Sequence, residues 1–369
     1  MALPDISPAL KLAHGTLQFP VFLPDATRGV VRALGSTDLE RSGVTGLVMS
    51  TFHLMQHPGS SVIQRHGGLH NFTNWSHPIV TDSGGFQVYS LVRQNPKSGS
   101  LTEKGMVYRA EDGTKYNLSP EKSIQLQVSY GGDIVYCLDD CTHVDDTDET
   151  QLDSVRRTIK WAKRCRNEFD RLMAQKKLEK RPLLFGVVQG GGVLELRQQC
   201  AEALLEIGFD GYGYGGYPLD REGKLVADIF AYVRELIPVQ YPLHALGVGH
   251  PQSVVDCTRL GYGIFDSALP TRDARKGRIY RFTSDPSLTD FNDKWFEYVY
   301  IEDKKHIRDT EPSSSFCGCE ACSGYSLSYL HHLYHIGDSL YMRLATIHNL
   351  TFMNQLIDRL RAKNMLHNG

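Results

Sequence analysis

Three of the eight cysteines in this chain of 369 residues lie within six positions, at Cys317, Cys319 and Cys322. Because we see no secretion signal, thiols at this spacing favour a metal site over disulfide bonds. Zn²⁺ takes four ligands in a tetrahedron, so one histidine would complete the set and leave no open position, as in structural zinc sites. The candidates are His331, His332, His335 and, 26 positions after Cys322, His348. The spacing does not choose among them, and three ordinary loop thiols are the alternative.

Acidic and amide side chains follow the ends of several short apolar segments. Asp82, Asp139, Gln189 and Asp266 each come directly after such a segment. A buried carboxylate is costly unless it is paired or functional, so we expect three such acids to do chemistry. Each acid taken alone could instead be the N-cap of the helix that follows it. The pair Gly215-Gly216 follows another segment and would let the backbone approach a planar ligand, although glycine pairs mostly mark turns.

A run of basic residues follows Asp266. It consists of Arg272, Arg275, Lys276, Arg278 and Arg281, with Asp273 as the one acid among them. The formal net charge of −2 argues against general attraction to nucleic acid, so binding would need a local patch of this kind. A basic patch beside an acid suits a phosphate-bearing polymer whose sugar meets the carboxylate. The alternative is a charged run that faces solvent.

Eight short apolar segments are expected to be β-strands. They are Phe19–Leu23, Gly46–Met49, Pro78–Thr81, Asp133–Leu138, Leu183–Val188, Gly208–Tyr214, His244–Val248 and Gly261–Phe265. Several are apolar on both faces, which is typical of a parallel sheet covered by helices. Helices are predicted between them at Ser119–Tyr130, Asp148–Gln175, Leu194–Ile207, Val226–Leu236 and Gln252–Leu260. This alternation predicts an α/β fold of the (β/α)₈ TIM-barrel type, with catalytic groups at the carboxyl ends of the strands; an open doubly wound sheet is the alternative.

The pattern changes after about Pro286. We expect residues 1–285 to form the catalytic barrel and residues 286–369 a zinc-binding, mostly helical appendage packed on it. Apolar residues at helical spacing predict one helix from Leu327 to His348, whose far end would bring His348 to the cysteines. No apolar stretch approaches the ~18 residues of a membrane span, so we expect a soluble, intracellular protein.

Several longer motifs run through the chain. They are Met49-Ser-Thr-Phe-His-Leu, Gly68-Leu-His-Asn-Phe, Val80-Thr-Asp-Ser-Gly-Gly-Phe-Gln-Val, Leu138-Asp-Asp-Cys-Thr, Gly186-Val-Val-Gln-Gly-Gly, Gly247-Val-Gly and Phe265-Asp-Ser-Ala-Leu-Pro-Thr-Arg. With these motifs and the cysteine–histidine set, the chain resembles the tRNA-guanine transglycosylases over nearly its whole length. That family consists of TIM-barrel glycosyltransferases of queuosine modification. They exchange guanine at wobble position 34 of tRNAs with GUN anticodons for a 7-deazaguanine base.

The resemblance implies a role for each candidate residue. Asp266 would be the nucleophile and Asp82 the general acid/base. The base would be bound by Ser83, Phe86, Asp139, Gln189, Gly215, Gly216, Tyr217 and Leu246, with Phe86 stacked on it. The anticodon loop would be bound by Arg272, Arg275 and Lys276, and one structural Zn²⁺ by Cys317, Cys319, Cys322 and His348. Family members act as homodimers, so we expect a homodimer in the cytoplasm.

These roles fit the chemistry. Breaking an N-glycosidic bond builds positive charge on the ribose C1′, which the Asp266 carboxylate can capture as a covalent glycosyl-enzyme. The leaving guanine needs a proton and the incoming base must lose one, so Asp82 can serve both halves. The target base must first leave its stack, which favours a single-stranded loop. A carboxylate at Asp139 suits the N–H donors of guanine, and the Gln189 amide suits its carbonyl edge.

The chain departs from the bacterial pattern in the loop that would recognise the base. Residues 215–221 read Gly-Gly-Tyr-Pro-Leu-Asp-Arg instead of Gly-Gly-Leu-Ala-Val-Gly-Glu. Because proline has no N–H, the Tyr217–Pro218 peptide offers only a carbonyl, which favours a base with an aminomethyl group at C7. The precursor base preQ1 and the larger base queuine both carry that amine. Other departures are Asp220 as a displaced substitute for the glutamate, Leu246 for methionine and Ser50 for asparagine.

Three other functions are considered. A non-catalytic tRNA-binding subunit of a heteromeric transglycosylase is the main alternative, and the presence of both Asp82 and Asp266 argues against it. An archaeosine-type enzyme would carry additional RNA-binding domains, which we do not find before Gly369. A metal-dependent barrel hydrolase would need an open metal position, which a saturated thiolate site lacks.

Overall fold

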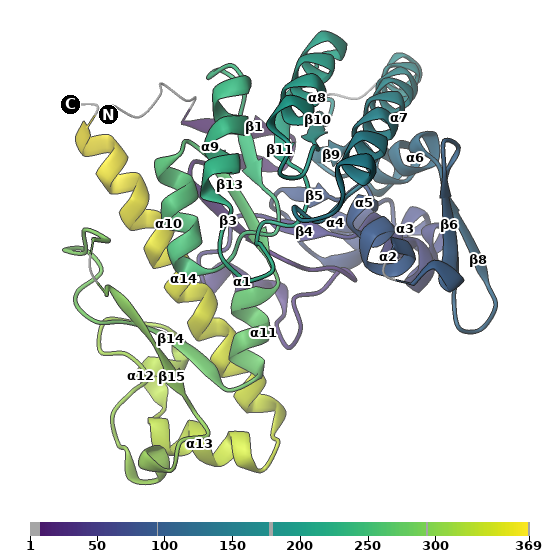
Figure 1. The fold of residues 1–369 in the computed structure, drawn as a ribbon. Coiled ribbons are helices and arrows are strands. Elements are labelled where there is room, and N and C mark those ends of the chain that lie inside the picture. The colour runs from purple at the N-terminus through teal and green to yellow at the C-terminus, as the bar shows by residue number, and fades with distance from the viewer. Residues whose placement is uncertain (1–7, 94, 177–179, 293, 368–369) are drawn as a thin grey trace.

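The structure is a computed structural model that describes residues 8–93, 95–176, 180–292 and 294–367, and an eight-stranded parallel sheet forms its centre (Figure 1). The strands are β3 (Val21–Pro24), β4 (Leu47–Met49), β5 (Ile79–Thr81), β9 (Ile134–Tyr136), β10 (Leu183–Val188), β11 (Gly211–Tyr214), β12 (Leu243–Ala245) and β13 (Ile264–Ser267). Their hydrogen-bonded order is β3-β13-β12-β11-β10-β9-β5-β4, and a parallel bridge between Asp25 and Val48 joins the two ends. The predicted (β/α)₈ barrel is therefore confirmed.

All eight predicted strands are present, most of them with shorter bounds. The strand β10 has the predicted bounds, whereas β12 ends at Ala245, three residues before the predicted end. Gly247 adopts a φ of +77°, a left-handed conformation that turns the chain out of the strand. The residues after β12 therefore belong to a loop at the carboxyl end of the barrel.

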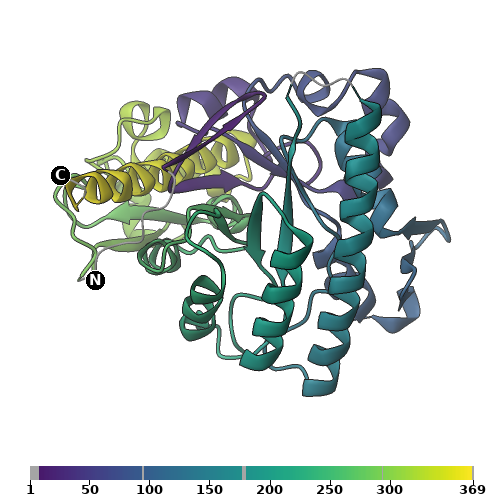
Figure 2. The ribbon, with the colours of Figure 1, turned by 90° about the horizontal axis from the view of Figure 1, so that it is seen from above.

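Helices cover the outside of the sheet, as Figure 2 shows for α7, α8 and α14. Those that follow the strands are α1 (Ser36–Arg41), α6 (Pro120–Tyr130), α7 (Asp148–Gln175), α8 (Leu194–Ile207), α9 (Ala227–Leu236), α10 (Pro251–Arg259) and α11 (Leu269–Arg275). The five predicted helices agree with α6 to α10 within one residue at each end. Ser119 caps α6 by accepting a hydrogen bond from the Lys122 N–H. None of the described helices combines the length and apolar character needed to cross a bilayer.

Smaller elements extend the barrel at both ends. Between β4 and β5 lie α2 (Thr51–Leu54), a π-helical turn (Met55–Gly59), α3 (Ser60–Arg65) and α4 (Leu69–Thr73). After β5 come α5 (Gly85–Gln87), a π-helical turn (Val88–Arg93), a 3-10 turn (Pro96–Ser98) and the antiparallel strands β6 (Gly99–Thr102), β7 (Gly105–Arg109) and β8 (Lys115–Leu118). The N-terminal hairpin of β1 (Ala9–Leu12) and β2 (Gly15–Gln18) contributes Leu12 and Leu17 to the apolar cluster inside the barrel.

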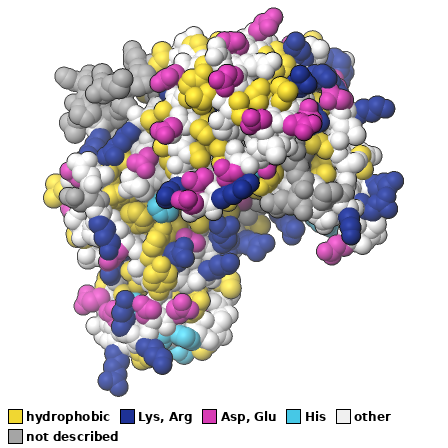
Figure 3. All heavy atoms as spheres, in the orientation of Figure 1, with side chains coloured by type: hydrophobic (Ala, Val, Ile, Leu, Met, Phe, Trp, Pro, Cys, Tyr) yellow, Lys and Arg dark blue, Asp and Glu magenta, His cyan; other side chains and the backbone are white. Residues whose placement is uncertain are grey.

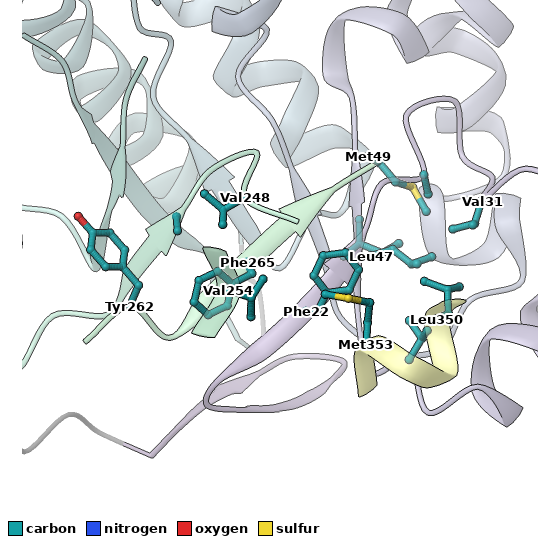
Figure 4. Packing of buried hydrophobic residues seen from close by; sticks show 14 of the residues in the cluster. Phe22, Val31, Leu47, Met49, Val248, Val254, Tyr262, Phe265, Leu350 and Met353 are labelled. Carbon is teal, nitrogen blue, oxygen red and sulfur yellow. The ribbon is translucent and has the colours of Figure 1, made fainter. Parts of the chain in front are cut away.

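The C-terminal appendage is built around one long helix, α14. Its elements are β14 (Arg278–Phe282), β15 (Phe296–Tyr300), a 3-10 turn (Lys304–Arg308), α12 (Glu320–Gly324), α13 (Leu327–His335) and α14 (Ser339–His367). Leu350 and Met353 of α14 pack beside Phe22 and Leu47 of the barrel strands (Figure 4). Since β14 and β15 pair with each other across Pro286, the division into residues 1–285 and 286–369 stays a prediction.

The predicted single helix from Leu327 to His348 is wrong in one respect. The structure has two helices there, and the chain turns between them at Gly337, whose φ is +70°. Glycine just after a helix is the usual C-terminal stop, because it adopts this conformation without a steric penalty. His348 consequently lies within α14 instead of at the end of a single long helix.

Candidate active site

A cavity of about 480 Å³ opens at the carboxyl ends of the barrel strands. The predicted site residues that line it are Asp82, Ser83, Phe86, Asp139, Gly215, Gly216, Tyr217, Leu246, Asp266 and Arg272. Gln189 lies directly behind this lining, because its amide Nε2 donates a hydrogen bond to Asp139 at 2.7 Å. The structure thus brings the predicted acids, the amide and the glycine pair together around one cavity.

Asp82 follows β5 and lies deep in the cavity. Its Oδ1 accepts a hydrogen bond from the Thr51 N–H at 2.9 Å, and Gln87 Nε2 lies 3.4 Å from Oδ2. Burial raises the pKa of Asp82 to about 7, although hydrogen bonds from Ser50 and Thr51 oppose the shift. At neutral pH this carboxyl group can therefore both hold and release a proton.

Asp139 follows β9 and is held by two side chains. Gln189 Nε2 donates to its Oδ2 at 2.7 Å, and the Ser83 hydroxyl donates to Oδ1 at 3.1 Å. Burial raises the pKa of Asp139 to about 6, with these hydrogen bonds opposing the shift. Gln189 Oε1 is buried and has no hydrogen-bond partner among the described residues, as expected of a group that a ligand or water satisfies.

Glycine is required at two places beside these polar groups. A Cβ on Gly85 would lie 2.0 Å from Asp139 Oδ1, and a Cβ on Gly215 would lie 2.7 Å from Gln189 Nε2. Neither glycine has a positive φ, so close approach and not backbone conformation explains them. The predicted approach of the glycine pair to a planar ligand stays a prediction.

Asp266 is the last acid of the cavity, near the end of β13. Its Oδ1 accepts a hydrogen bond from the Gly247 N–H at 2.9 Å, and His244 Nε2 lies 2.9 Å from the same oxygen. His244 was not among the predicted site residues, because it falls inside a predicted strand. Asp25 was not predicted either; it lines the cavity two residues after the first predicted strand, and burial raises its pKa.

The rim of the cavity is formed by aromatic side chains. Phe86 is 51% exposed, so its ring is open for the predicted stacking on a base. The Tyr217 ring stacks on His143 with 5.5 Å between centroids, and the Tyr217 N–H donates to the Thr142 carbonyl at 3.1 Å. Asp220 caps its own turn, accepting hydrogen bonds from the N–H groups of residues 222 and 224. These hydrogen bonds hold the turn at residues 220–224, and the role of Asp220 as a substitute for the glutamate stays a prediction.

The basic run divides into two groups. Arg278 lies 3.4 Å from Asp273, and Arg281 forms an ion pair with Glu297 at 2.6 Å. The other three basic residues are Arg272 and Lys276, which are exposed on and just after α11, and the half-buried Arg275. Figure 3 shows lysine and arginine side chains gathered over this part of the surface, between the barrel and the appendage.

Comparison with known proteins identifies the family. The family model described as queuine tRNA-ribosyltransferase matches residues 8–364. The queuine tRNA-ribosyltransferase of Shewanella halifaxensis (strain HAW-EB4) is 38% identical over 355 residues, which cover 95% of this chain and 88% of that protein. The same enzyme of Shewanella sp. (strain W3-18-1) is 38% identical over 352 residues, covering 94% and 87% of the two chains. The chain belongs to the queuine tRNA-ribosyltransferase family. The predicted resemblance to the tRNA-guanine transglycosylases is confirmed.

This queuine tRNA-ribosyltransferase family member has a group of four metal-ligating side chains in the appendage. One atom each of Cys317, Cys319, Cys322 and His348 lies within 4.8 Å of the others. His348 Nδ1 is 3.2 Å from Cys322 Sγ and 3.6 Å from Cys319 Sγ, while Nε2 is 2.7 Å from the Tyr280 carbonyl. An Nε2–H that donates to this carbonyl leaves the Nδ1 lone pair facing the sulfurs, which is how metal-binding histidines are oriented.

The Cys₃His group therefore fits a metal ion, and its ligand types suit Zn²⁺. Of the nearer histidines, His331 is engaged with the Ile301 carbonyl at 2.7 Å. The structure thus selects His348, and the four ligands lie outside the barrel mouth.

A second group of possible ligands, His14, His70 and Asp133, lies at the opposite end of the barrel, where β9 begins. The two imidazole rings are stacked, with centroids 3.5 Å apart and planes 20° from parallel. Lone pairs in nearly parallel planes cannot both point at one ion. Asp133 also accepts hydrogen bonds from the His14 and Ile79 N–H groups. This group therefore fastens the N-terminal hairpin to the barrel.

Proposed function

We propose that this family member exchanges guanine at wobble position 34 of tRNAs with GUN anticodons for a 7-deazaguanine base. The exchange would pass through a covalent glycosyl-enzyme. The observation that carries the proposal is the placement of Asp82 and Asp266 in one cavity together with Asp139. A carboxyl group with a pKa of about 7 beside an accessible carboxylate supplies an acid/base and a nucleophile.

In the first half of the reaction, Asp266 attacks C1′ of the ribose as the bond from C1′ to N9 of guanine breaks. The guanine leaves with a proton taken from Asp82, which becomes a carboxylate. In the second half, Asp82 takes a proton from the incoming base, whose nitrogen attacks C1′ and releases the Asp266 carboxylate. Asp82 is then protonated and Asp266 ionised as at the start, guanine has been released, and the new base occupies its place on C1′, so no redox cofactor is required.

The base would be recognised by polar groups already held in place. Asp139 can accept hydrogen bonds from the N–H donors on one edge of a guanine-like base. Gln189 and the backbone at Gly215 and Gly216 would meet its other polar atoms, with Ser83 and Leu246 beside them and Phe86 stacked on the ring. Because Pro218 has no N–H, the Tyr217–Pro218 peptide offers only its carbonyl to an aminomethyl group, and the preceding Tyr217 N–H is already engaged with Thr142. Both preQ1 and queuine carry this group, and both remain candidates.

The proposal extends to the partners and the metal. Arg272, Arg275 and Lys276 would bind phosphates of the anticodon loop from α11. Cys317, Cys319, Cys322 and His348 would bind one Zn²⁺ that supports the fold of the appendage and takes no part in the reaction. We expect a homodimer in the cytoplasm, where its tRNA substrates are found. Mass photometry at nanomolar concentrations would show the homodimer directly.

The test is exchange of radiolabelled preQ1, queuine and guanine into tRNA with a GUN anticodon, with the three bases in parallel. We expect wild-type enzyme to incorporate an aminomethyl base and to form a covalent adduct with tRNA that survives denaturing electrophoresis. Asp266→Asn should abolish both signals. Asp228→Asn is the matched control, because that acid is exposed on α9, away from the cavity.

The outcomes separate the proposals. Exchange and adduct that persist in Asp266→Asn would disprove the role of this residue as nucleophile. A wild-type protein that binds tRNA without adduct or exchange would instead support the non-catalytic subunit. Incorporation of preQ1 without queuine would show that the altered loop does not admit the larger base.

A further inference from the structure

A buried histidine, His244, contacts Asp266, the proposed nucleophile. His244 is on β12, next to β13, and its side chain is 1% exposed. Nε2 lies 2.9 Å from Asp266 Oδ1, and Nδ1 lies 2.7 Å from the Tyr136 hydroxyl. Tyr136 is on β9, which is not a neighbour of β12 in the sheet, so this contact crosses the interior of the barrel. Three strands thus contribute to one chain of contacts that ends at Asp266.

The contacts favour one of the two neutral tautomers of His244, because in the other a lone pair on Nε2 would face the Asp266 oxygen 2.9 Å away. Burial, together with the nearby charge of Asp266, raises the pKa of Tyr136 well above its usual range, so its hydroxyl keeps its proton. Among the described residues, the hydrogen-bond partner of this hydroxyl is His244 Nδ1. If the hydroxyl donates to Nδ1, the neutral imidazole must carry its proton on Nε2. A protonated imidazole would carry a proton there as well, so Nε2–H faces Asp266 in both cases.

Only one of the two carboxylate oxygens of Asp266, Oδ1, is contacted by protein groups among the described residues. Oδ1 accepts from the Gly247 N–H at 2.9 Å and faces the Nε2–H of His244 at 2.9 Å. Oδ2 makes no hydrogen bond within the part of the chain that the structure describes, and the residue lines the cavity. One hydrogen bond, from Gly247, and the close approach of His244 Nε2, a buried atom with no hydrogen-bond partner among the described residues, both fall on Oδ1 and leave Oδ2 to react.

We infer that His244, itself set by Tyr136, positions Asp266 to attack C1′ through Oδ2 and assists its departure in the second half of the reaction. This inference rests on the proposed function. When the bond from C1′ to Oδ2 forms, negative charge leaves the carboxylate, and when that bond breaks the charge returns. A donor at Oδ1 stabilises the returning charge, so it favours release of the glycosyl group over its retention.

This role predicts an unusual effect on the covalent adduct. Without the Nε2–H donor, release from Asp266 should slow more than formation of the adduct. The overall exchange rate should then fall roughly tenfold, the value of one lost hydrogen bond to a charged group. At the same time, the fraction of enzyme held as adduct during turnover should rise. A residue that only supports the fold would lower both quantities together.

The experiment compares His244→Phe, His244→Gln and Tyr136→Phe with wild-type enzyme, measuring the exchange rate and the adduct fraction in the same reactions. Phenylalanine keeps a ring of similar size without a donor. Glutamine keeps an N–H donor for Asp266 and an acceptor for the Tyr136 hydroxyl, so it should recover most of the rate and the wild-type adduct fraction. Tyr136→Phe removes one oxygen atom and should change both quantities in the same direction as His244→Phe, by less.

The result that overturns the inference is specific. An unchanged adduct fraction in His244→Phe would show that no donor to Asp266 is needed. The same conclusion would follow if the exchange rate fell equally in His244→Phe and His244→Gln. If His244→Phe does not fold, Tyr136→Phe decides, because an unchanged adduct fraction in that variant removes the argument for a fixed Nε2–H. Absence of any adduct in the wild-type enzyme would be a failure of the proposed function instead.

Discussion

Asp82 and Asp266 occupy similar positions on two strands that are not neighbours, β5 and β13, each at the carboxyl end of its strand, but their surroundings differ. Asp82 is buried deeply enough to raise its pKa to about 7, and it accepts a backbone hydrogen bond from Thr51. Asp266 lines the cavity, accepts a hydrogen bond from the Gly247 N–H at Oδ1 and has His244 Nε2 2.9 Å from the same oxygen. Two carboxyl groups in one site can take different roles when the environment of each favours a different protonation state.

The raised pKa of Asp82 predicts that stability depends on pH. Its folded-state pKa is about 7, above the ordinary value of 3.8, so between these values the folded chain holds a proton that the unfolded chain has lost. The stabilisation is fully present below about pH 4 and is lost as the pH rises to about 7. Asp82→Asn does not titrate, so its melting temperature relative to wild type should rise between about pH 5 and pH 7 and then level off.

The size of this effect is at most about 1.4 kcal/mol for each pH unit in that interval. Differential scanning calorimetry of Asp82→Asn and wild type across the interval measures it, with the exposed Asp228→Asn as control. Asp139 titrates in both proteins and cancels in the comparison. A difference in melting temperature between Asp82→Asn and wild type that does not vary with pH would contradict the raised pKa of Asp82.

At the level of single residues, the sequence predicts the acids better than it predicts their partners. Asp82, Asp139 and Asp266 each follow an apolar segment, and the carboxyl ends of barrel strands meet at one mouth, so their convergence follows from the fold class. The contact of His244 with Tyr136 joins residues 108 positions apart across the barrel interior. Such a contact depends on how the strands tilt and on which side chains face inward, and short-range patterns do not encode either.

At the level of elements, the repeating β–α units are predictable, whereas interruptions are not. The helices α7 and α8 have the predicted bounds, because long amphipathic segments between strands leave few alternatives. The predicted helix from Leu327 fails at Gly337, where apolar residues continue at helical spacing past a break of three residues. The spacing of apolar residues shows which face of a helix is buried but not where the helix ends. Both α13 and α14 bury one face in the same hydrophobic core cluster. Gly337 was the available signal for the break.

The short helix α5 provides a test of how closely backbone and Asp139 approach. In Gly85→Ala the new Cβ would lie 2.0 Å from Asp139 Oδ1 and 2.8 Å from the Asp139 backbone oxygen, so the carboxylate must move. A displacement of this kind costs about 1–3 kcal/mol, so we expect the affinity for the free base to fall roughly tenfold or more. Binding of tRNA, measured by filter binding, should change little, because the phosphate contacts are proposed for the basic residues on and just after α11 and not for Gly85.

Isothermal titration with preQ1 and queuine measures the effect on the base. Gly324→Ala is the control, since a Cβ at that position of α12 meets nothing within 4 Å. Wild-type affinity in Gly85→Ala would show that Asp139 has room to move, which would remove the proposed role of its fixed position in base recognition.

At the scale of the whole molecule, α14 joins the appendage to the barrel along its length. Near its start, Arg343 contacts both Asp38 of α1, at 2.6 Å, and Glu320 of α12, at 2.7 Å. Further along, Asn354 donates to the Ser42 carbonyl and Arg361 to the Pro20 carbonyl. His348 lies between these points, with the cysteines on one side and the Tyr280 carbonyl of β14 on the other. A metal ion at the Cys₃His group would therefore tie α12, β14 and α14 together.

The final prediction concerns this metal. Cys319→Ser removes one thiolate, so the protein should bind less than one Zn²⁺ per chain by mass spectrometry of metals and should melt at a lower temperature than wild type. The loss should be large, because structural zinc sites contribute free energy directly to folding. Cys257→Ser is the matched control: that cysteine is also buried, in α10, but it lies outside the ligand group. It should keep the full metal content even if its melting temperature falls.

The position of the ligands decides what this variant should do to the reaction. Because Cys319 is remote from the cavity that contains Asp82 and Asp266, molecules of Cys319→Ser that remain folded should still form the covalent adduct with tRNA. A soluble variant without metal, with an unchanged melting temperature, would contradict the structural role. Complete loss of adduct in folded, metal-free protein would place the metal in the reaction itself, which a group of four protein ligands with no open position does not support.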